Sequence, residues 1–237
     1  MIQRTPEPEL MNEPQQVQAY ARADFSSSDQ ALVERIDQLL QDAGRGPAAG
    51  DVLIDLGCGP GNISERLAMR WPSCTVVGVD AAELMILQAE ACRRKNNLSA
   101  ERLRYVVAAL PWQVPGFHAS VIVSNSLLHH LHDPQKLWSC LRPLAGSQCL
   151  LLHRDLRRPS TAEQLDLLCE RYAADAPEVL QRDYRASLQA AFTVDEVKAQ
   201  LRDAQLDHLQ VRELEDRYLE ISGWITGCQA GSDQPSA

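Results

Sequence analysis

The stretch that decides the fold of this chain is Val52-Leu-Ile-Asp-Leu-Gly-Cys-Gly-Pro-Gly61. Its first five residues form an apolar run that is typical of a strand buried on both faces. Glycines follow at positions 57, 59 and 61, and a helical pattern extends from Asn62 to Arg70. A strand, a glycine-spaced turn and a helix in this order predict a ligand-binding turn at the carboxyl edge of a parallel α/β sheet.

Each feature of this glycine loop (residues 57–61) suits a charged ligand. Glycine adopts positive φ angles and has no Cβ, so the backbone can turn tightly and approach a ligand closely. The N-terminus of the following helix offers unpaired N–H groups and the positive end of the helix dipole, which favour a carboxylate. Asp55, at the end of the strand, is expected to accept a hydrogen bond from an ammonium group, directly or through water. The loop therefore predicts a ligand with an amino-acid end.

A second acid, Asp80, ends the next apolar run along the chain. An acid at this place reaches ribose hydroxyls in dinucleotide sites. A charge-assisted hydrogen bond of this kind contributes roughly 1.5–3 kcal/mol. A nicotinamide enzyme is the obvious competitor, but its Gly-x-Gly-x-x-Gly pattern requires a glycine where this chain has Asn62. The spacing argues against that class, and a glycine-rich turn without a ligand remains the other alternative.

Short apolar runs alternate with helical patterns along the rest of the chain, which is typical of a parallel sheet covered by helices on both faces. Strands are expected at residues 52–56, 75–79, 104–108, 120–124 and 148–153, with an antiparallel pair at 209–212 and 218–222. Helices are expected at residues 15–23, 32–43, 62–70, 82–95, around 137–144, and across a charged stretch at 161–190. Capping boxes are expected at Ser160-x-x-Glu163 and Thr193-x-x-Glu196. Residues 1–13, rich in Pro and Glu, are expected to be mobile.

The composition limits the partners of the protein. With 23 Lys and Arg against 32 Asp and Glu the net charge is −9, which makes long nucleic acids poor partners. Seven scattered cysteines with no Cys-x-x-Cys pair argue against a disulfide framework or a zinc site. The sequence shows neither a secretory signal nor an apolar run of about 18 residues, so we expect a cytoplasmic protein without a membrane partner.

The pattern Asp55-x-Gly57-x-Gly59-x-Gly61, followed by Asp80, resembles the class I S-adenosylmethionine (SAM) dependent methyltransferases. The segment Ser124-Asn-Ser-Leu-Leu-His-His130 resembles the fourth-strand region of their small-molecule branch, the methyltransferase 11/25-like proteins. The resemblance covers residues 50–153 and, more loosely, 190–223. It implies an α/β fold with a Rossmann-like, mostly parallel seven-stranded sheet of order 3-2-1-4-5-7-6 and an antiparallel last strand.

The same resemblance divides the chain into three regions. Residues 1–46 are expected to form an N-terminal extension with cap helices. Residues 47–225 are expected to form the methyltransferase domain, with a helical insertion after strand five at about 159–190. Residues 226–237 are expected to be a polar tail.

The cofactor that the resemblance implies is SAM, with S-adenosylhomocysteine (SAH) as its product. The residues expected to bind it are Asp55, Gly57, Cys58, Gly59, Gly61, Asp80, Ala81, Ala109, Leu110 and Asn125. Many relatives carry an acid for the adenine amino group before a Leu-Pro-Phe sequence, whereas this chain has Val106-Val-Ala-Ala-Leu-Pro-Trp112. Adenine recognition is therefore expected to depend on backbone groups and on apolar packing near Leu110.

Methyl transfer from a sulfonium chiefly requires alignment of the acceptor, which can supply about 7–11 kcal/mol. Asn125 is expected to orient the acceptor and His129 to act as a base. Local bonds that shape the turn are the alternative for His129, His130 and His132. A metal site is not expected, because consecutive rings on a turn diverge and no carboxylate cluster accompanies them.

Substrate contacts are expected from Arg157 and Arg158, which follow the fifth strand and suit an anion, and from Tyr20 in the cap. Solvated ion pairs are the alternative for the arginines. Three functions remain open: a small-molecule methyltransferase, which we expect, an RNA or protein methyltransferase, and a SAM-binding protein without turnover. A monomer and a homodimer are both compatible with the sequence.

Overall fold

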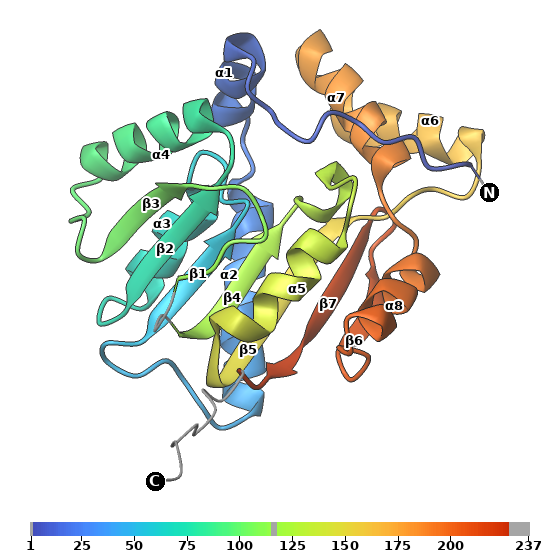
Figure 1. Ribbon diagram of the computed structural model, residues 1–237. Helices are drawn as coiled ribbons and strands as arrows, with labels where there is room; N and C mark the ends of the chain where they lie inside the picture. Colours follow the sequence, from blue (N-terminus) through green and yellow to red (C-terminus); the bar gives the residue numbers. More distant parts are fainter. Residues whose placement is uncertain (1, 115–117, 228–237) are drawn as a thin grey trace, which may run out of the picture.

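A seven-stranded sheet forms the centre of the protein. The computed structural model describes residues 2–114 and 118–227 (Figure 1). The strands are β1 (Val52–Leu56), β2 (Thr75–Asp80), β3 (Leu103–Val107), β4 (Ala119–Asn125), β5 (Ala145–Leu156), β6 (Gln210–Leu214) and β7 (Tyr218–Ile225). Their order is β3-β2-β1-β4-β5-β7-β6, and β7 pairs antiparallel with both β5 and β6. This confirms the expected fold and strand order.

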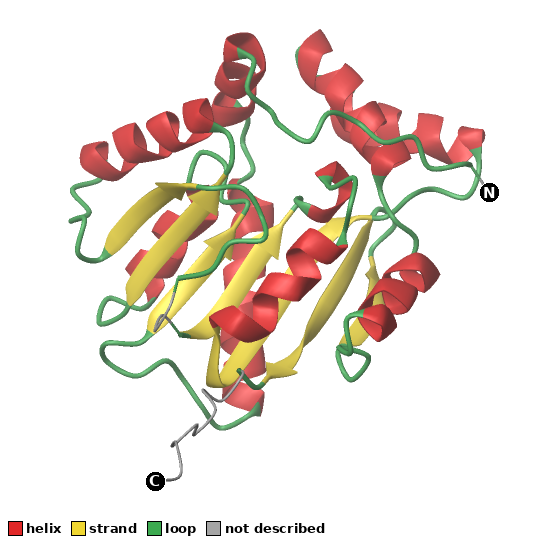
Figure 2. Cartoon of the chain, in the orientation of Figure 1, coloured by secondary structure: helices red, strands yellow, loops and turns green. Residues whose placement is uncertain are grey.

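Helices cover both faces of the sheet (Figure 2). They are α1 (Pro14–Arg22), α2 (Ser26–Asp42), α3 (Asn62–Arg70), α4 (Glu83–Lys95), α5 (Gln135–Leu144), α6 (Ala162–Ala173), α7 (Glu178–Ala190) and α8 (Val194–Asp203), with a 3-10 turn, η1 (Leu128–His130). Side chains of α2 and α3 pack on one face, and side chains of α5 and α8 pack on the other. In the described part of the chain, no helix has the length and apolar character that crossing a bilayer requires.

Alternation of side chains explains why the central strands are mostly apolar. In β1, Leu53 belongs to the core beneath α2 and α3, whereas Ile54 and Leu56 belong to the core beneath α5. All three side chains are 0% exposed. Because successive side chains point to opposite faces, a strand covered on both faces is apolar over most of its length, and the buried Asp55 of β1 is an exception at the carboxyl end.

Element boundaries agree with the expectations where they depend on local sequence. β1 and α3 have the expected limits. The expected strand at 148–153 is longer, since β5 runs from Ala145 to Leu156 and pairs with β7 from Cys149 onward. The expected continuous helix over 161–190 is two helices, α6 and α7, separated by a break that ends at Pro177.

One of the two expected capping boxes is present. The Thr193 side chain accepts the Glu196 N–H while Glu196 accepts the Thr193 N–H, which opens α8. The box expected at Ser160 is wrong, because α6 begins one residue later. Thr161 caps this helix and accepts the Gln164 N–H.

The N-terminal strap, residues 2–13, follows a defined path held by side-chain contacts, although the sequence predicts that residues 1–13 are mobile. The strap crosses the carboxyl edge of the sheet between α6 and α1 (Figures 1 and 2). Arg4 donates hydrogen bonds to the carbonyl oxygens of His129 and Leu131, both at 3.1 Å, and stacks 3.9 Å from the Phe192 ring centroid. Met1 and most of the expected polar tail, residues 228–237, lie outside the described residues.

Candidate cofactor and acceptor site

A cavity of about 990 Å³ lies at the carboxyl ends of β1, β2, β4 and β5. The glycine loop and Asp80 form one wall, and α1 and the start of α2 form the next. Residues of η1, α6, α7 and the β6–β7 turn close the remaining sides. Strand ends at the carboxyl edge of an open α/β sheet are the usual ligand site of this architecture.

The three glycines of the loop have positive φ angles, +71° at Gly57, +52° at Gly59 and +88° at Gly61. A Cβ atom at Gly57 would lie 2.7 Å from Leu127 Cδ1, and one at Gly61 would overlap the Tyr105 hydroxyl. A Cβ at Gly59 would meet no atom within 4 Å. Packing therefore explains two of the glycines, whereas Gly59 leaves an open space beside the cavity that suits the close approach of a ligand.

Asp80 fixes the glycine loop to the end of β2. Its Oδ2 accepts the Gly59 N–H at 2.8 Å, and its Oδ1 accepts the Ala82 N–H at 2.8 Å. Burial raises the pKa of Asp80, and the two backbone hydrogen bonds oppose this effect. The carboxylate also lines the cavity, so its remaining lone pairs are available to hydroxyl groups of a ligand.

Asp55 does not belong to the cavity lining, and its expected hydrogen bond with an ammonium group, directly or through water, stays a prediction. Its side chain is buried behind the glycine loop, with 1% exposure, and its Oδ2 accepts the Ser64 hydroxyl at 2.6 Å. Its observed role is to join the end of β1 to α3. Burial raises the pKa of Asp55 to about 7, and the nearby charges of Asp80 and Asp29 add to this effect.

The raised pKa of Asp55 predicts a pH-dependent stability. A carboxyl whose pKa rises from 3.8 to about 7 on folding holds its proton more tightly in the folded state. The contribution of the Asp55 carboxyl to the stability is complete below the pKa that it has in the unfolded chain. This contribution is lost as the pH rises through the pKa that the carboxyl has in the folded protein. Asparagine does not titrate, so the free energy of unfolding of Asp55→Asn should not show this loss. We expect the difference between the variant and the wild type to shift in favour of the variant as the pH rises from about 4 to about 7. Chemical denaturation over this pH range measures it, and parallel pH profiles would contradict the assignment.

Several residues expected at the cofactor do not belong to the cavity lining, so their role stays a prediction. The cavity lining includes Ala82 but not Ala81, Ala109 or Leu110, and Leu110 packs against the core on the α5 face. Cys58 does line the cavity, with 7% exposure. Burial raises the pKa of its thiol well above the usual value, which makes it a packing residue rather than a nucleophile.

Asp155 organises the turn that carries the histidines. Its Oδ2 accepts the Leu128 N–H at 2.6 Å, and its Oδ1 accepts the Leu156 N–H at 2.7 Å and contacts His129 Nδ1. Burial alone would raise the pKa of Asp155, but the adjacent His129 and His153 hold this pKa well below its usual value. Burial alone would lower the pKa of His129, and the charge of Asp155 outweighs this effect and raises it.

Glu7 brings a second carboxylate to the same turn. Its Oε1 lies 3.5 Å from His129 Nε2 and 3.2 Å from His130 Nδ1, and it accepts the Ser187 hydroxyl at 3.1 Å. Burial raises the pKa of Glu7. Burial and the charge of His129 lower the pKa of His130 to about 3. His129 lines the cavity, but both of its ring nitrogens face carboxylates, so its expected role as a base stays a prediction.

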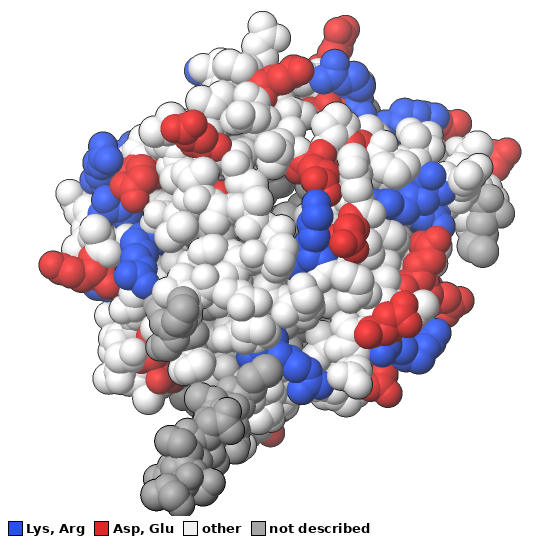
Figure 3. Space-filling model, in the orientation of Figure 1, with Lys and Arg blue, Asp and Glu red and all other residues white. Residues whose placement is uncertain are grey.

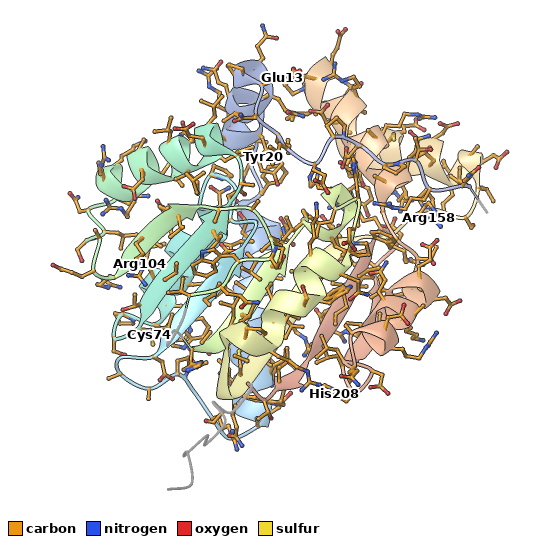
Figure 4. The ribbon with its side chains drawn as sticks, in the orientation of Figure 1. Glu13, Tyr20, Cys74, Arg104, Arg158 and His208 are labelled. Carbon is orange, nitrogen blue, oxygen red and sulfur yellow. The ribbon has the colours of Figure 1, made fainter. Side chains whose placement is uncertain are left out.

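The arginines expected to clamp a substrate are outside the cavity lining. Arg157 Nη1 pairs with Glu213 at 2.7 Å. Arg158 Nη2 pairs with Glu196 at 2.6 Å, and Figure 4 shows it on the side of the molecule away from Tyr20. Both guanidinium groups are paired with carboxylates and neither residue belongs to the cavity lining, so the substrate-binding role expected of Arg157 and Arg158 stays a prediction.

A different arginine and several aromatic rings line the cavity. Arg217 lies over the Tyr172 ring at 3.6 Å and the Tyr218 ring at 4.6 Å from their centroids. Its Nη1 is 3.4 Å from the Tyr184 hydroxyl. Tyr20 of α1 also lines the cavity and packs on Phe25 with ring centroids 4.9 Å apart, and its expected contact with the substrate stays a prediction. Asn125 also lines the cavity, at the end of β4.

The sheet order, the glycine loop and the acid at the end of β2 are the features of the class I SAM-dependent methyltransferase fold. Residues 54–151 match a family model described as a methyltransferase domain.

Curated relatives agree with this class. The chain is 33% identical over 108 residues to the trans-aconitate 2-methyltransferase of Pseudomonas aeruginosa PAO1, a match that covers 45% of this chain and 37% of that protein. It is 31% identical over 112 residues to the enzyme of the same name from Rhodopseudomonas palustris BisB18, covering 46% and 41% of the two chains. The matches therefore span less than half the length of these curated relatives.

Solved structures share the fold over most of the chain. The plantazolicin methyltransferase BpumL, in complex with a pentazolic desmethylPZN analog and SAH, superposes with a TM-score of 0.71 at 13% identity. The match covers 91% of this chain and 92% of BpumL. A SAM-dependent methyltransferase from Aquifex aeolicus gives 0.62 at 17% identity, covering 90% and 99% of the two chains.

Proposed function

We propose that the protein transfers the methyl group of SAM to a small-molecule acceptor held in the cavity at the carboxyl edge of the sheet. One observation carries the proposal: a cavity of about 990 Å³ is bounded both by the glycine loop with Asp80 and by a wall of aromatic and arginine side chains. The first part suits the cofactor and the second suits an acceptor. The matched methyltransferase domain and the trans-aconitate 2-methyltransferase relatives support this function.

The cofactor half of the site fits SAM through groups of this chain. The open space beside Gly59 and the N-terminus of α3 suit the amino-acid end of the cofactor. Asp80 suits the ribose hydroxyls, since both of its oxygens retain acceptor capacity. We assign no side chain to adenine, because the cavity lining contains no residue from the segment that follows β3. SAM, when bound, supplies an electrophilic methyl group on its sulfonium.

The protein's own contribution is to hold the acceptor and to exclude water. Asn125 and Ser126 line the cavity where β4 ends, between the cofactor wall and the acceptor wall. Their side chains are 3.3 Å apart, and Ser126 has a φ of +54°, which directs the chain into η1. Alignment of two reactants in this way can supply about 7–11 kcal/mol of the barrier.

The acceptor wall favours an anionic compound. Among the ion pairs of the described residues, none joins Arg217 to a carboxylate, and its Nε is buried without a hydrogen-bond partner. Arg154 also lines the cavity, and its partner Glu220 is shared with Arg35 and Arg212. One carboxylate thus compensates three guanidinium groups. A carboxylate or phosphate on the acceptor would satisfy the excess positive charge.

Labelled SAM incubated with a panel of small carboxylic and phosphorylated compounds tests the function. We expect methyl transfer to a member of the acidic panel and a KM for it about 10–100-fold higher in Arg217→Leu, since a hydrogen bond to a charged group contributes about 1.5–3 kcal/mol.

Arg157→Leu is the control, because it removes the same charge outside the cavity. Equal effects of the two variants would contradict the acceptor assignment. Failure of the wild type to bind SAH in calorimetry would contradict the function itself.

The face of the molecule in Figure 3 favours a small acceptor over RNA. On the face in Figure 3, Lys and Arg lie among Asp and Glu without a continuous basic patch. We also propose a cytoplasmic location, which is supported by six free cysteines in the described part of the chain, as expected of a reducing compartment.

A further inference from the structure

Three possible metal ligands from two distant parts of the chain meet beside the cavity. They are Glu7 of the N-terminal strap and the two histidines of η1, His129 and His130, here named the Glu-His-His trio. One donor atom from each lies within 4.8 Å of the others. Both histidines line the cavity, whereas the side chain of Glu7 is 9% exposed.

Distances within the Glu-His-His trio are longer than those of direct charge-assisted hydrogen bonds. Glu7 Oε1 is 3.5 Å from His129 Nε2 and 3.2 Å from His130 Nδ1. A charge-assisted N–H···O bond measures about 2.7–2.9 Å. Two ligands of a tetrahedral ion with bonds of about 2.0–2.1 Å lie about 3.3–3.4 Å apart. The spacing therefore fits an ion between the donor atoms.

One of the three donor atoms is unsatisfied without a ligand. His130 Nδ1 is buried and makes no hydrogen bond. A buried polar atom without a partner costs about 1–3 kcal/mol, so such atoms usually indicate a missing partner. This nitrogen lies 3.2 Å from Glu7 Oε1, the carboxylate oxygen that is 3.5 Å from His129 Nε2.

The groups that contact His129 and Glu7 from outside the trio are arranged as they usually are around metal-binding residues. His129 Nδ1 contacts the Asp155 carboxylate, which orients the ring and leaves Nε2 directed at Glu7. Metal-binding histidines almost always donate their second N–H to a carboxylate or carbonyl in this way. The Ser187 hydroxyl holds the Glu7 carboxylate from α7.

We propose that Glu7, His129 and His130 bind one divalent transition-metal ion, with an open coordination position reached from the cavity. Two imidazoles and one carboxylate with an open position are the ligand set of catalytic zinc and of non-haem iron(II). The two reasons to expect no metal do not hold in the folded chain. The two rings stack with centroids 4.2 Å apart rather than diverge, and the strap delivers the carboxylate.

An ion at this place would have two consequences. It would fasten the strap to η1, and its open position would accept an oxygen atom of an acceptor in the cavity. The competing account is an ordinary ion pair between Glu7 and His129 that fastens the strap without a metal. The two accounts differ in a binding measurement that requires neither SAM nor methyl transfer, so the proposal does not rest on the proposed function.

Calorimetric titration of the chelator-treated, tag-free full chain with Zn²⁺ tests the site. We expect one high-affinity equivalent per chain. In Glu7→Gln and His130→Gln we expect affinity to fall by at least about 100-fold, since loss of a ligand should exceed the 10–100-fold effect of losing an outer contact. Glu9→Gln is the matched control on the same strap, because Glu9 pairs with Lys136 and is expected to leave Zn²⁺ binding unchanged.

Two further readouts separate a metal site from a structural ion pair. Co²⁺ is expected to give the intense visible spectrum of a four-coordinate ion, without a thiolate charge-transfer band. Zn²⁺ is expected to protect the strap from limited proteolysis in the wild type and not in Glu7→Gln. Absence of wild-type binding, binding that persists in both ligand variants, or a thiolate band would overturn the proposal. Circular dichroism checks that each variant is folded.

Discussion

Gly59→Val is expected to weaken SAH binding by at least about 100-fold, or roughly 3 kcal/mol, without unfolding the protein. A side chain at this position meets no protein atom within 4 Å and extends into the space assigned to the cofactor. It blocks the approach of the ligand to the backbone rather than disturbing the core. The φ of +52° adds a backbone cost of about 1–2 kcal/mol for any L-residue.

Gly44→Val separates the two effects of this substitution. Gly44 has a φ of +63°, and a Cβ atom there would also meet no atom within 4 Å, but this glycine follows the end of α2, outside the cavity lining. The variant should carry a similar backbone cost and bind SAH normally. Calorimetry and thermal unfolding of both variants make the comparison. Equal loss of SAH affinity in the two, or normal affinity in Gly59→Val, would remove the glycine loop from the cofactor site.

Asp80→Asn is expected to reduce SAH affinity by about 100-fold and to lower the free energy of unfolding by about 1–3 kcal/mol. Both Asp80 oxygens accept backbone N–H groups, from Gly59 and from Ala82. In asparagine an NH₂ group replaces one carboxylate oxygen and must face the N–H of either Gly59 or Ala82. One hydrogen bond is therefore replaced by a contact between two donors. The substitution also removes the charge that suits the ribose hydroxyls.

Asp29→Asn is the matched control, since Asp29 is a second acid of the cavity lining and is 6% exposed. Burial raises the pKa of Asp29 to about 6, so asparagine replaces a group that is already costly to ionise. We expect less than a threefold change in SAH affinity, measured by the same calorimetry. An Asp29 effect as large as that of Asp80 would show that net charge, and not the ribose contact, controls binding.

The parts of the fold that follow from local sequence were predictable. The apolar run of β1 and the helical pattern after the glycine loop gave the observed limits, because neighbouring residues determine both. The length of β5 was not predictable in this way. Its last residues pair with β7, which follows more than 60 positions later in the sequence, so tertiary contacts extend the strand.

The candidate site shows the same division. The glycine loop and Asp80 were predictable because their spacing is local. Glu7 was missed because the strap has no periodic pattern, and only the folded chain brings it to His129. Asp155 stands between Arg154 and Arg157 in the sequence, and no local pattern indicates its contact with His129. The ion pair of Arg157 with Glu213 likewise forms across 56 residues of sequence.

The three guanidinium groups around Glu220 have a consequence for how an acidic ligand would arrive. The molecule as a whole carries a net charge of −9, so it repels an anion at long range, whereas the excess cations near Arg154 attract it at contact. Dissolved ions screen the distant repulsion first, since the Debye length is about 8 Å at physiological ionic strength. Added salt should therefore raise the association rate constant of the acidic ligand and also raise its dissociation rate constant. In an electrostatically steered pair, by contrast, added salt lowers the association rate constant.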